Sequence, residues 1–167
     1  MNTTTIRKLL LEVCDPEIPI LTIEDIGILR DVSFQDNTYK ITITPTYSGC
    51  PAMYHIRDRI KEVLDYHHID KYEVITQISP AWTTEWMSEE AKLKLKESGI
   101  APPQGANEND NFDVNDLLKV LKSPKAIQCP FCDSIDTKLI NKFGSTACKS
   151  LHYCNHCLQA FEHFKCH

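Results

Sequence analysis

The chain has 167 residues, of which 42% are apolar and 25% are charged, and its formal net charge is −5. This length suits one mid-sized domain or two small ones with packed cores. No segment is strongly basic, which argues against a surface that follows nucleic-acid phosphates. No apolar run approaches the ~18 residues of a membrane span. Glu12 and Asp15 interrupt any signal-peptide core. We therefore expect a cytoplasmic protein that binds neither membranes nor nucleic acid.

Apolar spacing and turn residues predict six elements in the first hundred residues. In chain order they are a helix over 6–13, strands near 28–34 and 39–46, a helix over 51–68, a strand over 72–79, and a helix from Ser88 to Gly99. The first two strands form a hairpin around the turn at residues 35–38. This order predicts an α+β fold in which helices pack on a small sheet, with residues 1–100 as one two-layer domain.

Residues 101–125 are expected to form a linker, because proline, glycine, asparagine and acidic residues dominate its first half. A short helix is predicted near its end, with an apolar face made of Val114, Leu117, Leu118 and Leu121. That face should dock on a neighbouring element, since it would be costly in water. A second module then occupies residues 126–167.

Six of the eight cysteines lie in this second module, and four of them form two C-x-x-C pairs. The pairs are Cys129 with Cys132 and Cys154 with Cys157. Two tight turns that each present two thiolates complete a tetrahedron, so the spacing predicts a zinc ribbon with a hairpin turning near Gly144. An iron-sulfur site is the alternative, because Cys148 and Cys166 add two further thiols. Packing as small apolar residues is the simpler role for those two.

Cys50 stands apart, within the stretch TPTYSGCPAM of residues 44–53. Pro51 is a preferred first helical residue, so Cys50 lies near the start of a helix. The positive end of the helix dipole stabilises a thiolate, and we expect a lowered pKa for this cysteine. Local physics leaves two roles open, a reactive or metal-binding thiol and a small buried residue at a turn. The carboxylates of the early loop, among them Asp15, Glu17 and Asp25, could line its surroundings.

Three ordered stretches resemble the iron-sulfur-assembly domain family of bacterial and cytosolic maturation factors. They are DPEIPILTIEDIGILRDV (residues 15–32), TPTYSGCPAM (44–53) and ISPAWTTEWMSEEAKLKL (78–95). The continuation through IAPP (100–103), CPFC (129–132), FGSTACKSLHYCNHC (143–157) and FEHFKCH (161–167) resembles the PaaD family, encoded with the phenylacetyl-CoA epoxidase of aerobic phenylacetate breakdown. The linker from Gln104 to Lys122 is longer here than in that family.

The resemblance implies an assembly-type domain joined to a zinc ribbon whose ligands are the four paired cysteines. It also implies that Cys50 is the functional cysteine, with Thr46 and Asp25 as its polar neighbours. The implied role is that of an accessory factor, not an enzyme, which matures the iron-sulfur reductase of the epoxidase system. Its cofactors would be zinc and a transient iron-sulfur cluster. Its partners would be the epoxidase subunits and iron-sulfur assembly proteins, and a homodimer stays open.

Two further hypotheses remain open from the sequence. The protein could be a purely structural subunit of the oxygenase complex, with both cysteine sites architectural. A zinc-ribbon nucleic-acid binder is the third hypothesis, and the acidic charge balance disfavours it.

Overall fold

The computed structural model describes residues 2–104 and 126–165. It divides into two compact units, one running up to Lys94 and one starting at Leu95. Most of the expected linker, including its short helix and apolar face, lies outside the described residues, and so does Cys166. Mixed helices and sheets in these units confirm the predicted α+β fold.

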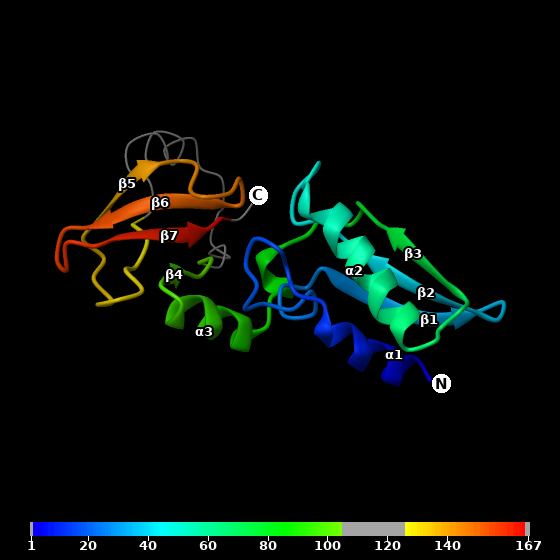
Figure 1. The fold of residues 1–167 in the computed structure, drawn as a ribbon. Helices are drawn as coiled ribbons and strands as arrows, with labels where there is room; N and C mark the ends of the chain where they lie inside the picture. Colours follow the sequence, from blue (N-terminus) through cyan, green and yellow to red (C-terminus); the bar gives the residue numbers. More distant parts are fainter. Residues whose placement is uncertain (1, 105–125, 166–167) are drawn as a thin grey trace. The chain divides into compact units, whose positions relative to one another are not determined.

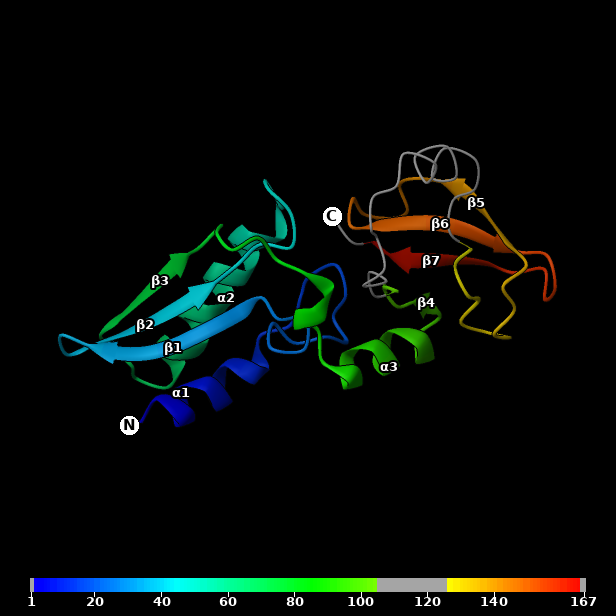
Figure 2. The same cartoon turned by 180° about the vertical axis from the view of Figure 1, so that it is seen from behind.

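The first unit consists of two helices on a three-stranded sheet (Figure 1). Its elements are α1 (Thr3–Leu9), the 3₁₀ turn η1 (Leu10–Glu12), β1 (Leu29–Gln35), β2 (Thr38–Ile43), α2 (Ala52–Tyr66), β3 (Tyr72–Thr76) and the 3₁₀ turn η2 (Thr84–Trp86). The strand order is β1-β2-β3, antiparallel between β1 and β2 and parallel between β2 and β3. Figures 1 and 2 show α2 lying along one face of this sheet.

The apolar stripe of α2 supplies much of the core of this unit. Ile56, Ile60 and Leu64 recur at four-residue spacing, which aligns them on one helix face, and all three are fully buried. Ile41 and Ile43 alternate along β2 and are also fully buried. Each such side chain contributes about 1.5–3 kcal/mol when it leaves water, so this interface holds the two layers together.

The hairpin between β1 and β2 turns at Asp36 and Asn37, which both have positive φ. Aspartate and asparagine tolerate this left-handed conformation better than most residues do. Two successive residues of positive φ match the twist of the flanking strands. The predicted turn and its hairpin are therefore confirmed.

The loop that precedes β1 is held against the segment that carries the two tryptophans. Trp82 is buried and donates its indole N–H to the Ile26 carbonyl at 3.0 Å. The Arg30 guanidinium lies 3.4 Å from the centroid of the Trp86 ring, which is cation–π geometry. Gly27 has φ of +80°, and a Cβ there would come within 2.5 Å of the Trp86 carbonyl oxygen. Glycine at this position is thus required twice, by conformation and by space.

The helix α3 (Glu89–Glu97) begins in the first unit and ends in the second. The Ser88 hydroxyl accepts the Ala91 N–H at 3.0 Å, so Ser88 caps the helix as predicted. Glu89 and Glu90 occupy its first turn, where the helix dipole favours negative charge.

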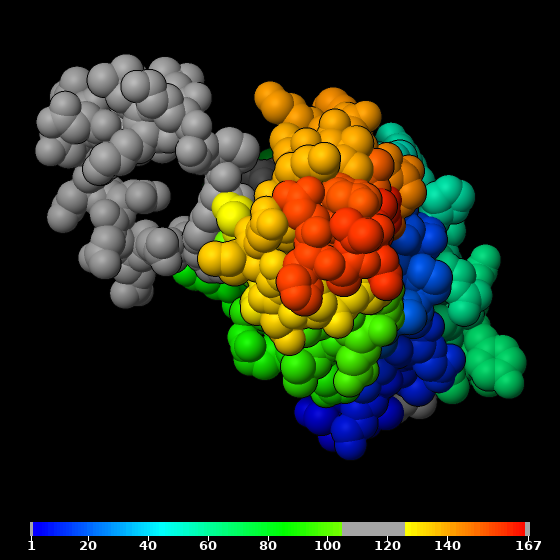
Figure 3. All heavy atoms as spheres, turned by 90° about the vertical axis from the view of Figure 1, so that its left-hand side faces the viewer, coloured from blue at the N-terminus to red at the C-terminus, as the bar shows by residue number. Residues whose placement is uncertain are grey.

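The second unit is built on a four-stranded sheet of order β4-β7-β6-β5. Its strands are β4 (Ile100–Ala101), β5 (Thr137–Asn141), β6 (Lys149–Cys154) and β7 (Ala160–Phe164). β5 and β6 form the predicted hairpin, and Gly144 lies in the loop between them. β4 pairs in parallel with β7. In the space-filling view of Figure 3 the residues of this unit from 126 onward, coloured yellow to red, form one closely packed body.

An ion pair anchors the hairpin loop of the second unit. The Lys149 ammonium is almost completely buried and lies 3.0 Å from the Glu162 carboxylate. Glu162 also accepts the N–H of Ser145, which ties the loop to β7. Burial acts to raise the pKa of Glu162, but these hydrogen bonds and the lysine charge outweigh it, and the pKa is lowered. Among the helices in the described ranges, none is long and apolar enough to cross a membrane.

Replacing Gly27 with alanine should destabilise the first unit by more than ~1 kcal/mol, the cost expected where φ is positive, because the new Cβ also meets Trp86. Gly49→Ala is the matched control, since Gly49 has φ of +82° but a Cβ there would meet nothing within 4 Å. Urea unfolding followed by tryptophan fluorescence measures both variants. Equal losses of stability in the two variants would show that the contact with Trp86 adds nothing to the cost of Gly27→Ala.

Candidate metal centre and the Cys50 pocket

The four paired cysteines of the second unit converge on one point. Their sulfur atoms all lie within 4.8 Å of one another, and this is the only such group of three or more potential ligands in the residues the structure describes. The Sγ atoms of Cys129 and Cys157 are 3.6 Å apart, and so are those of Cys132 and Cys154. A tetrahedral ion with bonds of about 2.3 Å to sulfur has edges of about 3.8 Å. The arrangement therefore fits a single tetrahedral metal ion.

An iron-sulfur cluster fits this arrangement poorly. The four cysteines of a [2Fe–2S] or [4Fe–4S] cluster are shared among two or four iron atoms, so they do not all lie at the edge lengths of one tetrahedron. The four sulfurs here are as close as ligands that share one ion. The geometry favours the single-ion alternative that the C-x-x-C spacing left open.

Both cysteine pairs lie on turns with the same backbone geometry. The residue after each second cysteine, Asp133 or Leu158, has a left-handed conformation with φ of 59° or 60°. Its N–H returns to the carbonyl of the first cysteine, at 3.0 Å from Asp133 to Cys129 and at 3.0 Å from Leu158 to Cys154. Leucine rarely adopts positive φ, so this conformation carries a cost. In return for this conformational cost, the turn brings the sulfurs of two cysteines to the same point.

Within the cluster, the pKa values of Cys154 and Cys157 are shifted in opposite directions. Burial acts to raise the pKa of Cys154, but the N–H groups of Cys157 and His156 and the neighbouring thiols lower it to about 6. Burial and the sulfurs of Cys132, Cys129 and Cys154 raise the pKa of Cys157 to about 12. One thiolate forms readily, and further thiolates are opposed by those already present. A bound cation would remove this opposition, so the donor set suits a divalent metal ion.

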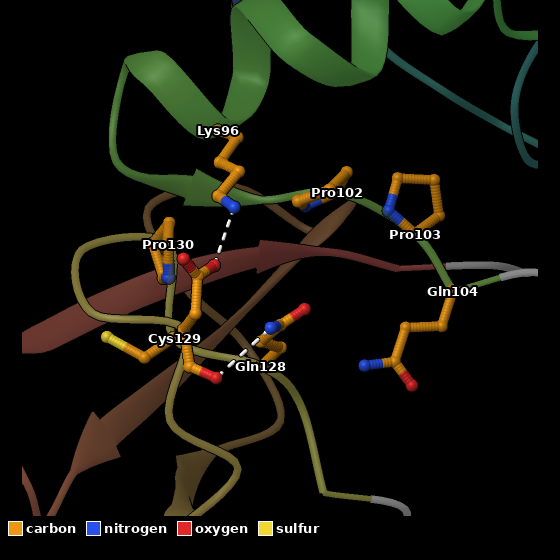
Figure 4. Close-up of a pocket in the computed structure, with 8 residues that line it drawn as sticks. Lys96, Pro102, Pro103, Gln104, Gln128, Cys129 and Pro130 are labelled. Carbon is orange, nitrogen blue, oxygen red and sulfur yellow. Dashed lines mark hydrogen bonds and ion pairs between the residues drawn. The ribbon is translucent and has the colours of Figure 1, made fainter.

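The end of α3 lies against the first of these turns (Figure 4). The Lys96 ammonium pairs with the Asp133 carboxylate, and Gln128 donates to the Asp133 carbonyl at 3.0 Å. These residues line a pocket of about 80 Å³ together with Pro102, Pro103, Gln104, Cys129 and Pro130. In Figure 4 the Cys129 sulfur points away from this pocket.

Cys148 is buried at the opposite end of β6 from Cys154. Six residues of extended strand span about 20 Å, so Cys148 cannot reach the four-sulfur cluster. Its sulfur lies 3.0 Å from the Thr146 hydroxyl instead. This fits the interpretation of Cys148 as a small packed side chain.

In the first unit Cys50 lies near the start of α2, as the sequence predicts, one residue before the N-cap Pro51. Its pKa is raised where we expected it to be lowered. Burial is the largest cause, because only 9% of Cys50 is exposed. The Ala52 N–H and the Tyr47 side chain donate hydrogen bonds that favour the thiolate. The charges of Glu17 and Asp15 add to the effect of burial. The prediction counted the helix start alone and was wrong because these other contributions are larger.

A surface pocket of about 290 Å³ gives access to Cys50. Pro45, Ser48, Gly49, Met53, Tyr54, Arg57, Thr76 and Ile78 complete its lining. The pocket lies where β2 and β3 end and α2 begins. Cys50 is thus a buried thiol with one route to solvent.

The other two residues singled out with Cys50 have different surroundings. The Asp25 carboxylate accepts the Thr22 N–H at 3.0 Å and pairs with the Lys94 ammonium at 3.0 Å. Burial acts to raise the pKa of Asp25, but these two partners lower it overall. Asp25 therefore fixes the loop before β1 to α3. Thr46 is half-buried beyond β2 and does not line the Cys50 pocket.

Sequence reasoning missed Arg57 as a pocket residue, although a signal was present. Met53, Tyr54 and Arg57 follow Cys50 at three, four and seven residues, which places them on one face of the predicted helix. Tyr47 precedes Cys50 by three residues in the same loop, but its hydrogen bond to the thiol was not anticipated. The charges of Asp15 and Glu17 do act on Cys50, as the early-loop carboxylates were expected to.

Two protein families match consecutive parts of the chain. The iron-sulfur cluster assembly protein family matches residues 3–70, and the PaaD zinc beta ribbon domain matches residues 115–165. A solved structure of a domain of unknown function, DUF59, from Bacillus anthracis has a TM-score of 0.51 and 32% identity. The match covers 56% of this chain and 90% of that domain.

Relatives extend these matches to nearly the whole chain. An Escherichia coli K12 protein, provisionally named as one of the subunits of 1,2-phenylacetyl-CoA epoxidase, is 42% identical over 161 residues. The match covers 96% of this chain and 91% of that protein. The Fe-S protein maturation auxiliary factor YitW of Bacillus subtilis 168 is 36% identical over 86 residues, which cover 50% of this chain and 83% of YitW.

Replacing Cys132 with serine should reduce the metal content from about one ion per chain to nearly none, because a structural site needs all four ligands. Strands β5 to β7 should then lose hydrogen-exchange protection, since metal binding contributes to the folding of such modules. Elemental analysis and hydrogen-exchange mass spectrometry measure the two effects. Cys148→Ala is the control and should keep its metal. A Cys132→Ser protein with undiminished metal would contradict the assignment.

Alkylation of Cys50 by iodoacetamide should rise with pH around a midpoint above that of an ordinary cysteine, because burial and two carboxylates raise its pKa. Glu17→Gln should move the midpoint to lower pH by removing one of those charges. Glu73→Gln, an exposed position on β3, is the charge-matched control. Mass spectrometry of the Cys50 peptide gives the rates. A midpoint below that of free cysteine would show that the helix start dominates after all.

Proposed function

Because the chain belongs to the PaaD family, we propose that it is a maturation factor for the iron-sulfur reductase of the phenylacetyl-CoA epoxidase system. The names of its relatives support an iron-sulfur maturation role and an association with the epoxidase. The observation that carries the proposal is the contrast between its two cysteine sites. One has four sulfurs around a point, and the other has one thiol in an accessible pocket.

Cys50 is proposed to hold iron or a cluster only in transit. Among the described residues, no group of three potential ligands includes Cys50. One thiol supplies one ligand, so the remaining ligands must come from the cargo or from the protein that gives or receives it. A site completed by its partner releases its cargo when the partner leaves, which suits transfer better than storage.

The raised pKa of Cys50 supports the same role. A thiol must lose its proton before it binds a metal, so a raised pKa weakens binding near neutral pH. The charges of Asp15 and Glu17 disfavour a further anion at this position. Cys50 would therefore hold an anionic, thiolate-ligated cluster less firmly than an ordinary surface cysteine does.

The four-cysteine site is proposed to hold zinc in a structural role. Zinc supplies positive charge without redox chemistry, and tetrahedral sulfur coordination is typical of structural zinc. Cys129 and Cys154 are fully buried, which leaves little room for exchange of ligands. We propose residues 1–100 as the assembly domain, 101–125 as the linker and 126–167 as the ribbon. The compact unit that contains the ribbon sheet starts earlier, at Leu95, and includes β4.

A structural role in the oxygenase complex is the second candidate, because one relative is named as part of the epoxidase. In that case the protein would be needed stoichiometrically even when every partner already carries its clusters. In the maturation role it would be dispensable once the reductase is fully clustered.

Reductase co-produced with Cys50→Ala protein should carry markedly less iron and acid-labile sulfide than reductase co-produced with unsubstituted protein. Cys14→Ala is the matched control, because Cys14 lies in the same unit but does not line the pocket. Iron and sulfide analysis with the visible absorption spectrum measures occupancy. Unchanged occupancy with Cys50→Ala would overturn the proposed role of Cys50. A stoichiometric requirement for this protein with fully clustered partners would favour the structural alternative.

A further inference from the structure

The pocket beside Cys50 is bordered by side chains that have no evident structural task. Tyr54 on α2 is 76% exposed, and Ile78 just after β3 is 68% exposed. They lie among the lining residues of one pocket together with Pro45 and Met53. Large apolar side chains gathered on one surface mark interaction sites more often than isolated ones do.

Arg57 is the cation of this pocket, and it differs from the other arginines. No carboxylate or carbonyl in the described parts of the chain pairs with its guanidinium, although the side chain is half-buried. The remaining arginines all have partners, Arg7 with Glu24, Arg59 with Glu62 and Arg30 with the Trp86 ring. A partly desolvated guanidinium that lacks an anion within the chain is complementary to a carboxylate from elsewhere.

We propose that the surface formed by Tyr54, Arg57 and Ile78 docks an acidic segment of the client protein beside Cys50. A carboxylate of the segment pairs with Arg57, and an adjacent apolar side chain packs against Tyr54 and Ile78. Docking there places the client's own cysteines within reach of the Cys50 thiol. The identity of the client rests on the proposed function, whereas the docking chemistry rests on the pocket alone.

A second copy of this chain is a poorer occupant of the same surface. A symmetric dimer places the same patch of both subunits face to face. The pocket lining contains an arginine and no carboxylate. Two copies joined at this patch would bring their Arg57 side chains together without a neutralising partner, and like charges in contact oppose association. An acidic partner supplies the charge that the lining lacks.

Binding of the purified apo-reductase to immobilised protein tests the inference. Arg57→Glu should raise the Kd roughly tenfold or more, the effect of losing one charge-assisted contact. Arg59→Glu makes the same change of net charge on another face of α2 and should bind normally. Tyr54→Ala should also weaken binding, whereas Tyr66→Ala should not, because Tyr66 is 79% exposed at the far end of the helix.

Cys50→Ala protein separates this inference from the proposed function. It should bind the reductase with unchanged affinity while failing to load it, because docking does not require the thiol. Equal affinities for the Arg57→Glu and Arg59→Glu proteins would overturn the docking surface, and so would an absence of binding by the unsubstituted protein. Self-association that Arg57→Glu abolishes would assign the surface to a second copy and overturn the inference as well.

Discussion

The crowding of four sulfur atoms at one point is the constraint on which the second unit depends. Cys129, Cys132, Cys154 and Cys157 lie on two turns at the same end of the sheet, one before β5 and one between β6 and β7, where Thr137 pairs with Cys154. The local apolar core contains only three other buried residues, Ala101, Ile127 and Phe161, within the part of the chain that the structure describes. A core of this size contributes little by itself in so short a segment. Neutralisation of the thiolates by a bound metal ion would supply the stability that this core lacks.

Cys50 carries the same thiol group as the four clustered cysteines, but its surroundings favour the protonated form. Its thiol receives hydrogen bonds at the start of α2, yet burial and the charges of Glu17 and Asp15 raise its pKa and favour the protonated form. Four mutually close thiols compel metal binding, whereas one buried thiol near carboxylates resists it. On the proposed function, the four-cysteine site would retain a metal and the Cys50 site would release its cargo. The number of converging thiols, four against one, and the carboxylates that act on Cys50 separate the two sites.

Patterns of short range along the chain were enough to predict most of the fold. C-x-x-C spacing, the stripe of Ile56, Ile60 and Leu64, and the turn at Asp36 and Asn37 are all encoded within a few residues. The pairing of β4 with β7 could not be found in this way, because a strand of two residues has no periodicity and its partner lies 62 residues later, at Ile100 and Glu162. The same limit explains the error at Cys50. Local physics described the helix start, but burial, the largest cause of the raised pKa, depends on how distant segments pack around the thiol. The smaller effect of Glu17 and Asp15 comes from more than thirty positions earlier.

Charges of both signs act near Cys50, and they bear on the proposed transfer. Asp15 and Glu17 act on the thiol, while the pocket beside it contains Arg57 and no carboxylate. An acidic segment that approaches would be repelled by the two carboxylates and attracted by Arg57, so charge would favour docking at Arg57. A cluster ligated by thiolates is itself anionic and would be held weakly beside the carboxylates. On the proposed function, the arrangement that would guide a client to Arg57 would also favour the departure of the cargo from Cys50.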